Sequence, residues 1–271
     1  MANVLEIMEW YVDAGVDIML EDAPIDRFAE TETLLTKTRE PKTQQPRKLP
    51  ERKAQQTPAR VQPTATMPDA ETAKAARELA VSAASLEDLQ KIMTGFDGCN
   101  LKRTAKTTVF ADGNPASRIM FIGEAPGRDE DIQGLPFVGR AGQLLDRMLA
   151  AINLTRENAY ITNVIPWRPP GNRTPTPQET EICRPFIERH IELIQPELIV
   201  MLGGSSAKTL LKTTDGIMRL RGKWTEVVTP NSTVKSMPTL HPAYLLRQPA
   251  QKRLAWQDFL QVRQFLEGLS A

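Results

Sequence analysis

The chain has 271 residues, of which 41% are hydrophobic, enough for one large domain with a sizeable core or for one domain with an appendage. Its two cysteines exclude a disulfide scaffold and fit a reducing compartment such as the cytoplasm. The formal net charge of +1 favours no class of partner until it is divided along the chain.

The charge is polarised. Residues 1–30 hold eight acidic residues and one basic residue, a balance of −7. Residues 31–75 hold nine basic and five acidic residues, and residues 76–271 hold 24 basic and 20 acidic residues, so each balances at +4. The chain is therefore expected to have an acidic head, a basic linker and a mildly basic body, which permits binding to phosphate backbones without requiring it.

The head has the apolar spacing of one or two short amphipathic helices over residues 3–23. Glu6 and Glu9 interrupt its apolar stretch, which excludes a signal peptide, and no run approaches the ~18 apolar residues of a membrane span. We therefore expect a soluble cytoplasmic protein that makes no membrane contact. The head either docks into the groove of a protein partner or is a terminal extension without a specific role.

The linker, residues 31–75, contains six prolines, no glycine and no aromatic residue. Such a segment cannot bury enough apolar surface to offset the entropy that ordering costs, so we expect it to be disordered.

From residue 76 to residue 271 the pattern alternates between short apolar strands and amphipathic helices, which predicts a single doubly wound α/β domain. The strands are expected to be parallel and buried on both faces. The expected strands are RIMFIG, AYITNVI, ELIVMLG and SMPTLHP, and the expected helices lie at 76–95, 141–152, about 177–194, 205–212 and about 250–267.

The loop after the first strand, GEAPGRDEDIQGLPFVG, holds more glycines and carboxylates than a turn needs, so we expect it to hold a ligand. In doubly wound sheets the ligand site lies beyond the carboxyl ends of the strands. Asn163 with the loop PWRPPGNR, the Gly203-Gly204-Ser205 turn and His241-Pro242 also follow strands, so we expect them at the same edge.

Four stretches, GEAPGRDEDIQGLPFVGRAGQLLD, YITNVIPWRPPGNRTPTPQE, CRPFIERHIELIQPELIVMLG and HPAYLLRQP, resemble the family 4 (type-4) uracil-DNA glycosylases. The resemblance covers roughly residues 93–260 and keeps several motifs in order. It implies a three-layer α/β/α sandwich with a four-stranded parallel sheet. It also implies base flipping and hydrolytic removal of uracil from DNA, the first step of base-excision repair.

The resemblance places the GEAPG turn against the flipped nucleotide. It makes Glu124 a group that orients water or stabilises cationic character on the sugar, with Glu130 as a further acidic catalytic candidate. The better-known uracil glycosylases carry an aspartate where this chain has Ala125, at the uracil-binding turn, so the group that activates water stays unassigned. The alternative for Glu130 and Asp131 is that they are solvated or cap the following helix.

Three further residues are implied to bind and release the base. Phe137 would stack on the uracil ring, where stacking contributes roughly 1–3 kcal/mol per base, although an isolated Phe is more often core. Asn163 offers a donor and an acceptor that suit the uracil edge, or it serves a turn. His241 would face uracil O2 and stabilise the departing anion. His190 lies in mid-helix, and we interpret it as structural.

DNA contacts outside the base pocket are expected for one loop and two helix starts. Arg168 and Arg173 would touch the DNA backbone, and Ser205 would bind phosphate or simply cap its helix. One residue of the stretch after His241 would fill the gap left by the flipped base, unless that stretch only packs its own leucines. The candidates are Tyr244, Leu245, Leu246 and Arg247.

The chain departs from the family at the iron–sulfur site. Most members hold a 4Fe–4S cluster on four cysteines, of which this chain keeps Cys99 and Cys183. Phe96 and Trp167 stand at the other two positions. Two thiolates cannot hold a cluster that needs four ligands, so we expect no cluster, no other cofactor and apolar packing in its place.

Other interpretations remain open from the sequence. One is a DNA-binding or uracil-sensing module that has lost catalysis. Another is a glycosylase for other deaminated bases such as hypoxanthine. The weakest is a nucleotide-binding α/β protein, which would require a phosphate-binding loop with an acidic residue to bind the ribose. We expect a monomer whose partner is uracil-containing DNA.

Overall fold

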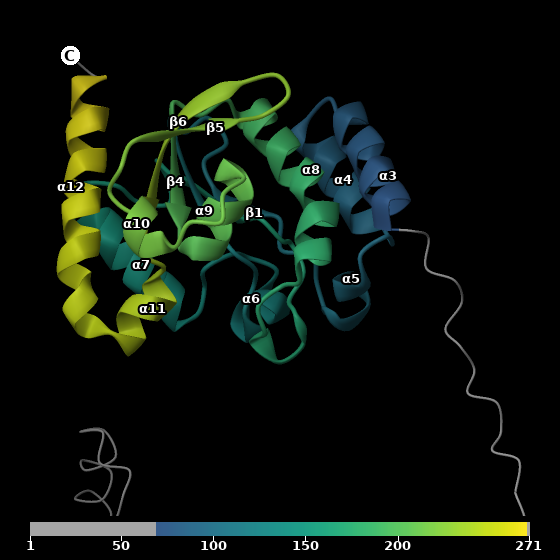
Figure 1. Cartoon of the computed structure of the whole chain (residues 1–271), viewed down its shortest axis with the longest axis horizontal. Coiled ribbons are helices and arrows are strands. Elements are labelled where there is room, and N and C mark those ends of the chain that lie inside the picture. Colours follow the sequence, from purple (N-terminus) through teal and green to yellow (C-terminus); the bar gives the residue numbers. More distant parts are fainter. Residues whose placement is uncertain (1–68, 270–271) are drawn as a thin grey trace, which may run out of the picture. The chain divides into compact units, whose positions relative to one another are not determined.

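The computed structural model describes residues 69–269, and they form a sheet between two layers of helices (Figure 1). The acidic head at 1–30 and the linker as far as residue 68 lie outside the described residues. The first described helix, α3, covers Asp69–Ser82, so regular structure begins inside the segment expected to be linker. No helix within 69–269 is long and apolar enough to cross a membrane.

The sheet has six strands in the order β1-β3-β2-β4-β6-β5. Its four central strands run parallel, as expected, and the α/β class is confirmed. The sheet as a whole is mixed, because β1 and β5 pair antiparallel to β3 and β6 at its two edges. The strands are β1 (Ala111–Gly113), β2 (Ile119–Gly123), β3 (Tyr160–Asn163), β4 (Leu198–Leu202), β5 (Thr225–Val228) and β6 (Thr233–Thr239).

The expectation of four strands missed the two edges for a physical reason. The sequence of β1 is ADG and that of β5 is TEVV, and all but one of these residues keep some exposure to solvent. Edge strands therefore lack the continuous apolar run that marks the central strands, where β2 and β4 are fully buried.

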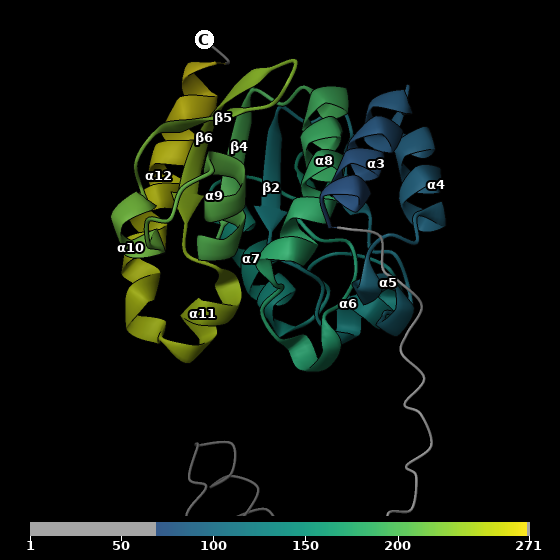
Figure 2. The same ribbon diagram turned by 45° about the vertical axis from the view of Figure 1, so that its right-hand side comes forward.

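Two helical layers cover the sheet (Figures 1 and 2). Met120 and Ile122 of β2 pack into one apolar cluster, while Ile119 and Phe121 pack into the other, as the two-residue period of a strand requires. The first cluster draws on α3, α4 (Leu86–Gly95), α8 (Pro177–Ile194) and α9 (Gly204–Leu211), and the second on α7 (Arg140–Ala150) and α12 (Lys252–Gly268).

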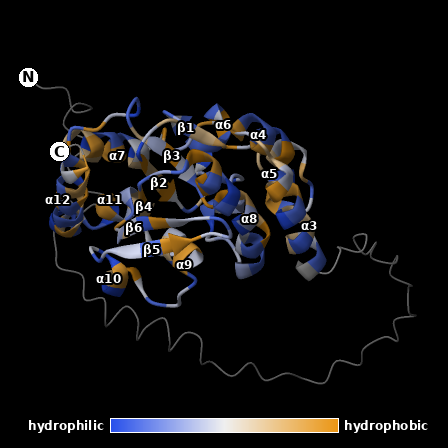
Figure 3. Ribbon diagram, turned by 90° about the horizontal axis from the view of Figure 1, so that it is seen from above, coloured by the Kyte–Doolittle hydropathy of each residue, from blue (hydrophilic) through white to orange (hydrophobic). Residues whose placement is uncertain are grey.

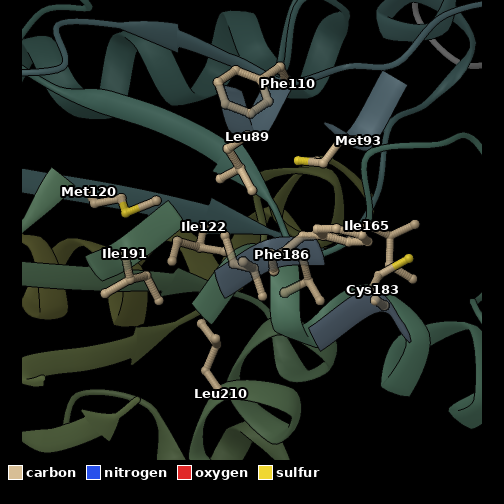
Figure 4. Packing of buried hydrophobic residues seen from close by; sticks show 14 of the residues in the cluster. Leu89, Met93, Phe110, Met120, Ile122, Ile165, Cys183, Phe186, Ile191 and Leu210 are labelled. Atoms are coloured by element: carbon tan, nitrogen blue, oxygen red, sulfur yellow. The ribbon is translucent and has the colours of Figure 1, made fainter. Parts of the chain in front are cut away.

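Figure 4 shows the first cluster, where Ile122 of β2, Phe186 of α8 and Leu210 of α9 lie together. Seen from above, α8 and α12 each carry both hydrophobic and hydrophilic residues, as helices with one buried face should (Figure 3). The single helix expected at 76–95 is two helices, because Ser85 ends the irregular residues after α3 and caps α4 by accepting a hydrogen bond from Asp88 N at 3.1 Å.

The short helices lie mainly in the connections. In both side views α5, α6 and α11 gather at one edge of the sheet (Figures 1 and 2). The short helices are α5 (Asn100–Thr104), α6 (Arg128–Gln133), α10 (Ile217–Leu220) and α11 (Pro242–Arg247), and there are 3-10 turns at Pro170–Asn172 and Pro249–Gln251.

His190 is buried in the first cluster and belongs to α8. Its Nε2 shares a hydrogen bond of 2.7 Å with the Tyr160 hydroxyl, and its ring stacks on Phe110 with centroids 4.5 Å apart. Burial lowers the pKa of His190 from 6.5 to about 3, so the folded protein holds this side chain neutral over most of the pH range.

A buried neutral histidine makes stability depend on pH. The unfolded chain binds a proton at His190 below about pH 6.5 and the folded chain does not, so the free energy of unfolding falls as pH drops from about 6.5 toward 3, by up to about 1.4 kcal/mol per pH unit. His190→Gln keeps a hydrogen-bond partner for Tyr160 but does not titrate. Its free energy of unfolding, measured with urea, should therefore fall less steeply than that of the wild type between pH 6.5 and 4. Equal slopes would contradict this account.

Candidate active site

A pocket of about 430 Å³ opens at the carboxyl edge of the sheet, where β2, β3 and β6 end. It brings together six of the site residues proposed from the sequence for catalysis and uracil binding: Glu124, Ala125, Glu130, Phe137, Asn163 and His241. The remaining lining residues are Pro126, Gly127, Ala141, Pro169, Asn172, Arg173, Thr174, Ala243, Tyr244 and Arg247. Asn172 lies in the loop PWRPPGNR and Thr174 directly follows it, but neither was expected in the site, since polar loop residues carry no periodic signal.

Gly123 is the last residue of β2 and lies behind the pocket. A Cβ at this position would lie 2.3 Å from Asn163 Oδ1 and 2.6 Å from Phe137 Cζ. Neither contact is compatible with a side chain, so glycine is required for the Asn163 amide and the Phe137 ring to meet here.

Phe137 is buried and has a φ of +54°, in the left-handed region that residues with a Cβ rarely adopt. Its ring stacks against the His241 ring with centroids 5.6 Å apart and an interplanar angle of 29°. Helix α7 approaches closely from behind, because a Cβ on Gly142 would lie 1.6 Å from the Phe137 carbonyl oxygen. The ring is therefore held between the pocket and a helix that comes within backbone contact.

Asn163 ends β3 and is only 6% exposed. Its side-chain amide has no hydrogen-bond partner among residues 69–269 and opens onto the pocket. This donor and acceptor are therefore available to a ligand with the complementary pair.

His241 precedes α11 as its N-cap residue. Its Nδ1 accepts a hydrogen bond of 3.1 Å from Ala243 N, so the neutral ring carries its hydrogen on Nε2. Burial, and then the nearby charge of Arg247, lower the pKa of His241 from 6.5 to about 4. At neutral pH the side chain is therefore an uncharged hydrogen-bond donor.

Glu124 follows Gly123 and is half-buried in the pocket wall. Burial raises the pKa of its carboxyl above the usual 4.5, and no described residue donates a hydrogen bond to that carboxyl. A carboxylate that is partly desolvated and unpaired is a candidate for accepting a proton from water.

Glu130, proposed above as a catalytic candidate, has a structural role instead. Its Oε2 accepts a hydrogen bond from Gly127 N at 3.0 Å, and its Oε1 accepts from Val138 N at 3.0 Å and Gly139 N at 2.9 Å. Asp131 is buried and accepts from Lys106 N at 2.7 Å and Thr107 N at 3.2 Å. The alternative of helix capping and loop support is therefore the better description of both.

The arginines and serine proposed for DNA differ in position. Arg173 lies on the pocket rim and pairs with Glu179 at 2.6 Å. Arg168 is outside the lining and donates to Asn172 Oδ1 at 2.7 Å. Ser205 is also outside the lining, and the residue before α9 is Gly203, which caps without a side chain, so the proposed serine cap is wrong.

The candidates on α11 are not equivalent. Leu245 is 1% exposed and packs with Leu144, Leu240 and Ala255, so it cannot enter the gap left by a flipped base. This corrects its place among the DNA contacts. Tyr244 and Arg247 line the pocket, and Leu246, which precedes Arg247 in the sequence, is half-buried.

The four positions at which the resemblance implied iron–sulfur ligands lie in the apolar core. Cys99 and Cys183 are buried with their Sγ atoms 4.0 Å apart. The Phe96 and Trp167 rings are stacked with centroids 6.4 Å apart, and Trp167 Nε1 donates to Thr108 Oγ1 at 3.0 Å. In the described part of the chain, no three His, Cys, Asp or Glu side chains are placed to hold a metal, so these residues do not fit a four-thiolate cluster.

Comparison with known proteins now adds to this geometry. The family model of the uracil DNA glycosylase superfamily matches residues 110–260, more than half of the chain, and the chain therefore belongs to that superfamily.

The type-4 uracil-DNA glycosylase of Archaeoglobus fulgidus is 42% identical over 182 residues, which are 66% of this chain and 92% of that protein. Those of Saccharolobus solfataricus and Thermotoga maritima are 40% and 39% identical, over 63% and 62% of this chain and 81% and 88% of their own lengths. These relatives place the chain among the type-4 members of the superfamily.

The role of Glu130 can be tested against its neighbour. Glu130→Ala leaves three backbone N–H groups without their acceptor and should lower the free energy of unfolding by about 1–3 kcal/mol. Asp129→Ala removes an exposed carboxylate that accepts no hydrogen bond within 69–269, so it should change the free energy of unfolding by less than about 0.5 kcal/mol. Urea unfolding and amide exchange at Gly127, Val138 and Gly139 would measure this. Equal effects of the two substitutions would refute the structural role.

Proposed function

We propose that this chain is a monofunctional uracil-DNA glycosylase, which hydrolyses the N-glycosidic bond of a deoxyuridine flipped out of DNA. The observation that carries the proposal is the meeting of an unpaired Asn163 amide, a stacked Phe137 ring and an uncharged His241 donor in one pocket. The family membership supports the same reaction, because the relatives bear that name.

Base binding rests on Asn163 and Phe137, and base selection rests on Asn163 alone. The amide oxygen accepts the hydrogen of uracil N3, and the amide nitrogen donates to uracil O4. Cytosine presents a ring nitrogen without hydrogen and an amino group at these places, so the same amide would meet it with acceptor against acceptor and donor against donor. Phe137 stacks on the ring without distinguishing one base from another.

Bond cleavage rests on His241 and Glu124. When the bond between C1′ and N1 breaks, its electron pair leaves with the uracil ring, and the Nε2–H of the neutral His241 donates to O2, where negative charge gathers. The sugar becomes oxocarbenium-like. Glu124, as its carboxylate, lies in the pocket wall where it can orient water toward C1′ and take its proton.

Contacts with the rest of the DNA are proposed for the pocket rim. Arg173 and Arg247 bring positive charge there, and Tyr244 and Leu246 are the remaining candidates to fill the space the base leaves. Arg168 and Ser205 stay proposals for backbone contacts farther from the base.

A binding module without catalysis is the second candidate function. It would need the base-reading groups, Phe137 and Asn163, but not a desolvated Glu124 without a partner. The placement of Glu124 therefore favours the enzyme.

The excision assay separates these functions. Protein is incubated with a labelled oligonucleotide containing one uracil, and alkali then breaks the strand at any abasic site. The wild type should cleave, His241→Ala should be about 10²- to 10³-fold slower, and Glu124→Gln about 10²- to 10⁴-fold slower. Asn163→Ala should also lose most activity, whereas Gln143→Ala, which removes an exposed amide on α7, should not. Uracil-dependent binding without any cleavage by the wild type would favour the module.

We propose further that the enzyme works without an iron–sulfur cluster. The stacked Phe96 and Trp167 rings and the two remaining thiols support this. Protein purified without oxygen and still active should contain far less than one iron per chain. A double variant, Phe96→Cys with Trp167→Cys, supplies four thiols and serves as the control that should take up iron and sulfide on reconstitution. Stoichiometric iron in the wild type would contradict the proposal.

A further inference from the structure

A partly buried guanidinium lies behind the ring that we propose for base stacking. Arg156 belongs to the connection between α7 and β3, and its side chain is 25% exposed. It donates to the Pro136 carbonyl at 3.1 Å and also to the Phe137 carbonyl. The peptide groups on both sides of Phe137 are thus bound by one side chain.

Two carboxylates from separate elements hold Arg156 in place. Its Nε donates to Asp146 on α7 at 2.8 Å, and its Nη1 donates to Asp112 on β1 at 2.5 Å. Burial opposes the charged form, but the hydrogen bonds to Asp146 and Asp112 outweigh it and raise the pKa of Arg156. The guanidinium is therefore permanently charged and fixed from two sides.

The edge strand β1 reaches Arg156 because it ends in glycine. Gly113 has a φ of +97°, and a Cβ there would lie 2.1 Å from the Ala159 carbonyl oxygen and 2.8 Å from that of Arg156. A side chain would push β1 away and with it Asp112. The short antiparallel strand β1 thus places the Asp112 carboxylate beside Arg156, behind the pocket.

Phe137 needs such a restraint. Its φ of +54° is unfavourable for a residue with a Cβ, and a conformation of this kind persists only where the surroundings determine it. Gly142 of α7 closes one side of its carbonyl, and Arg156 supplies a charged donor to the same oxygen. Without that donor, the Phe137 backbone can relax toward a more favourable negative φ, and the ring would then turn away from His241.

We propose that Arg156 is a positioning residue for base stacking: it fixes the Phe137 backbone so that the ring stays in the pocket beside His241 and Asn163. The inference rests on the proposed function, in which the ring stacks on uracil. Arg156 lines no part of the pocket itself, so it acts through Phe137 and not on the substrate.

A double-substitution cycle separates this role from ordinary stabilisation. Arg156→Met keeps an apolar stem of similar length and removes all donors. It should slow single-turnover excision by about 5- to 150-fold, the range expected when stacking on one base is lost. In a Phe137→Ala background the same substitution should change the rate by less than about twofold, because the ring it positions is gone.

The matched control is Arg118→Met. Arg118 also pairs with a carboxylate, Glu197 at 2.7 Å, and donates to a backbone carbonyl, that of Leu269 at 3.2 Å, but it lies at the opposite end of β2 from the pocket. Its loss should lower the thermal midpoint without slowing excision in either background. Arg156→Lys, which keeps the charge but cannot reach all four acceptors, should fall between wild type and Arg156→Met.

Binding is measured in parallel with an oligonucleotide carrying 2′-fluoro-2′-deoxyuridine, whose fluorine resists cleavage. If the wild type binds this oligonucleotide but excises no uracil from the unmodified substrate, the proposed enzyme fails, and the substitution cycle is still evaluated from the dissociation constants. If Phe137→Ala does not fold, Phe137→Leu replaces it. Equal fold-losses for Arg156→Met in both backgrounds, or an equal loss of activity in Arg118→Met, would overturn the positioning role.

Discussion

The site depends on the absence of a side chain at Gly123. Three strands of the sheet end at one edge, and at the end of β2 the Phe137 ring and the Asn163 amide come within 2.6 and 2.3 Å of where a Cβ would stand. Close packing therefore decides that a flat aromatic surface and an amide share one small volume. The backbone around this point is adapted to it, since Phe137 accepts a left-handed φ and Gly142 lets α7 approach its carbonyl.

Burial also sets the electrostatics of the pocket. It lowers the pKa of His241 to about 4 and raises the pKa of Glu124, so at neutral pH the first is a neutral donor, and the second has a higher affinity for protons than an exposed carboxylate. In a partly desolvated pocket each of these groups interacts more strongly with developing charge than it would in water. In the proposed reaction, the same physical cause would prepare the groups on the two sides of the glycosidic bond.

Stability and chemistry are separated in the described domain. Phe96, Trp167 and the two cysteines belong to the apolar cluster that joins α3, α4 and α8 to the sheet. The pocket lies at the strand ends, where Glu130 and Arg156 hold the surrounding backbone. The aromatic packing in the first region can therefore differ without disturbing the second.

The sequence by itself determined the parallel centre of the sheet, because buried strands carry continuous apolar runs, and it pointed to Glu124, Phe137, Asn163 and His241, which the tertiary structure brings into one pocket. Only the tertiary structure decided which neighbours of these residues are left without protein partners and so available to a ligand. Glu130 and Leu245 both lie inside motifs that match the family. The Glu130 carboxylate accepts hydrogen bonds from backbone N–H groups, and the Leu245 side chain packs in an apolar cluster. Arg156 and Asp112 belong to no motif, because hydrogen bonds across 44 residues of chain leave no periodic trace in a sequence.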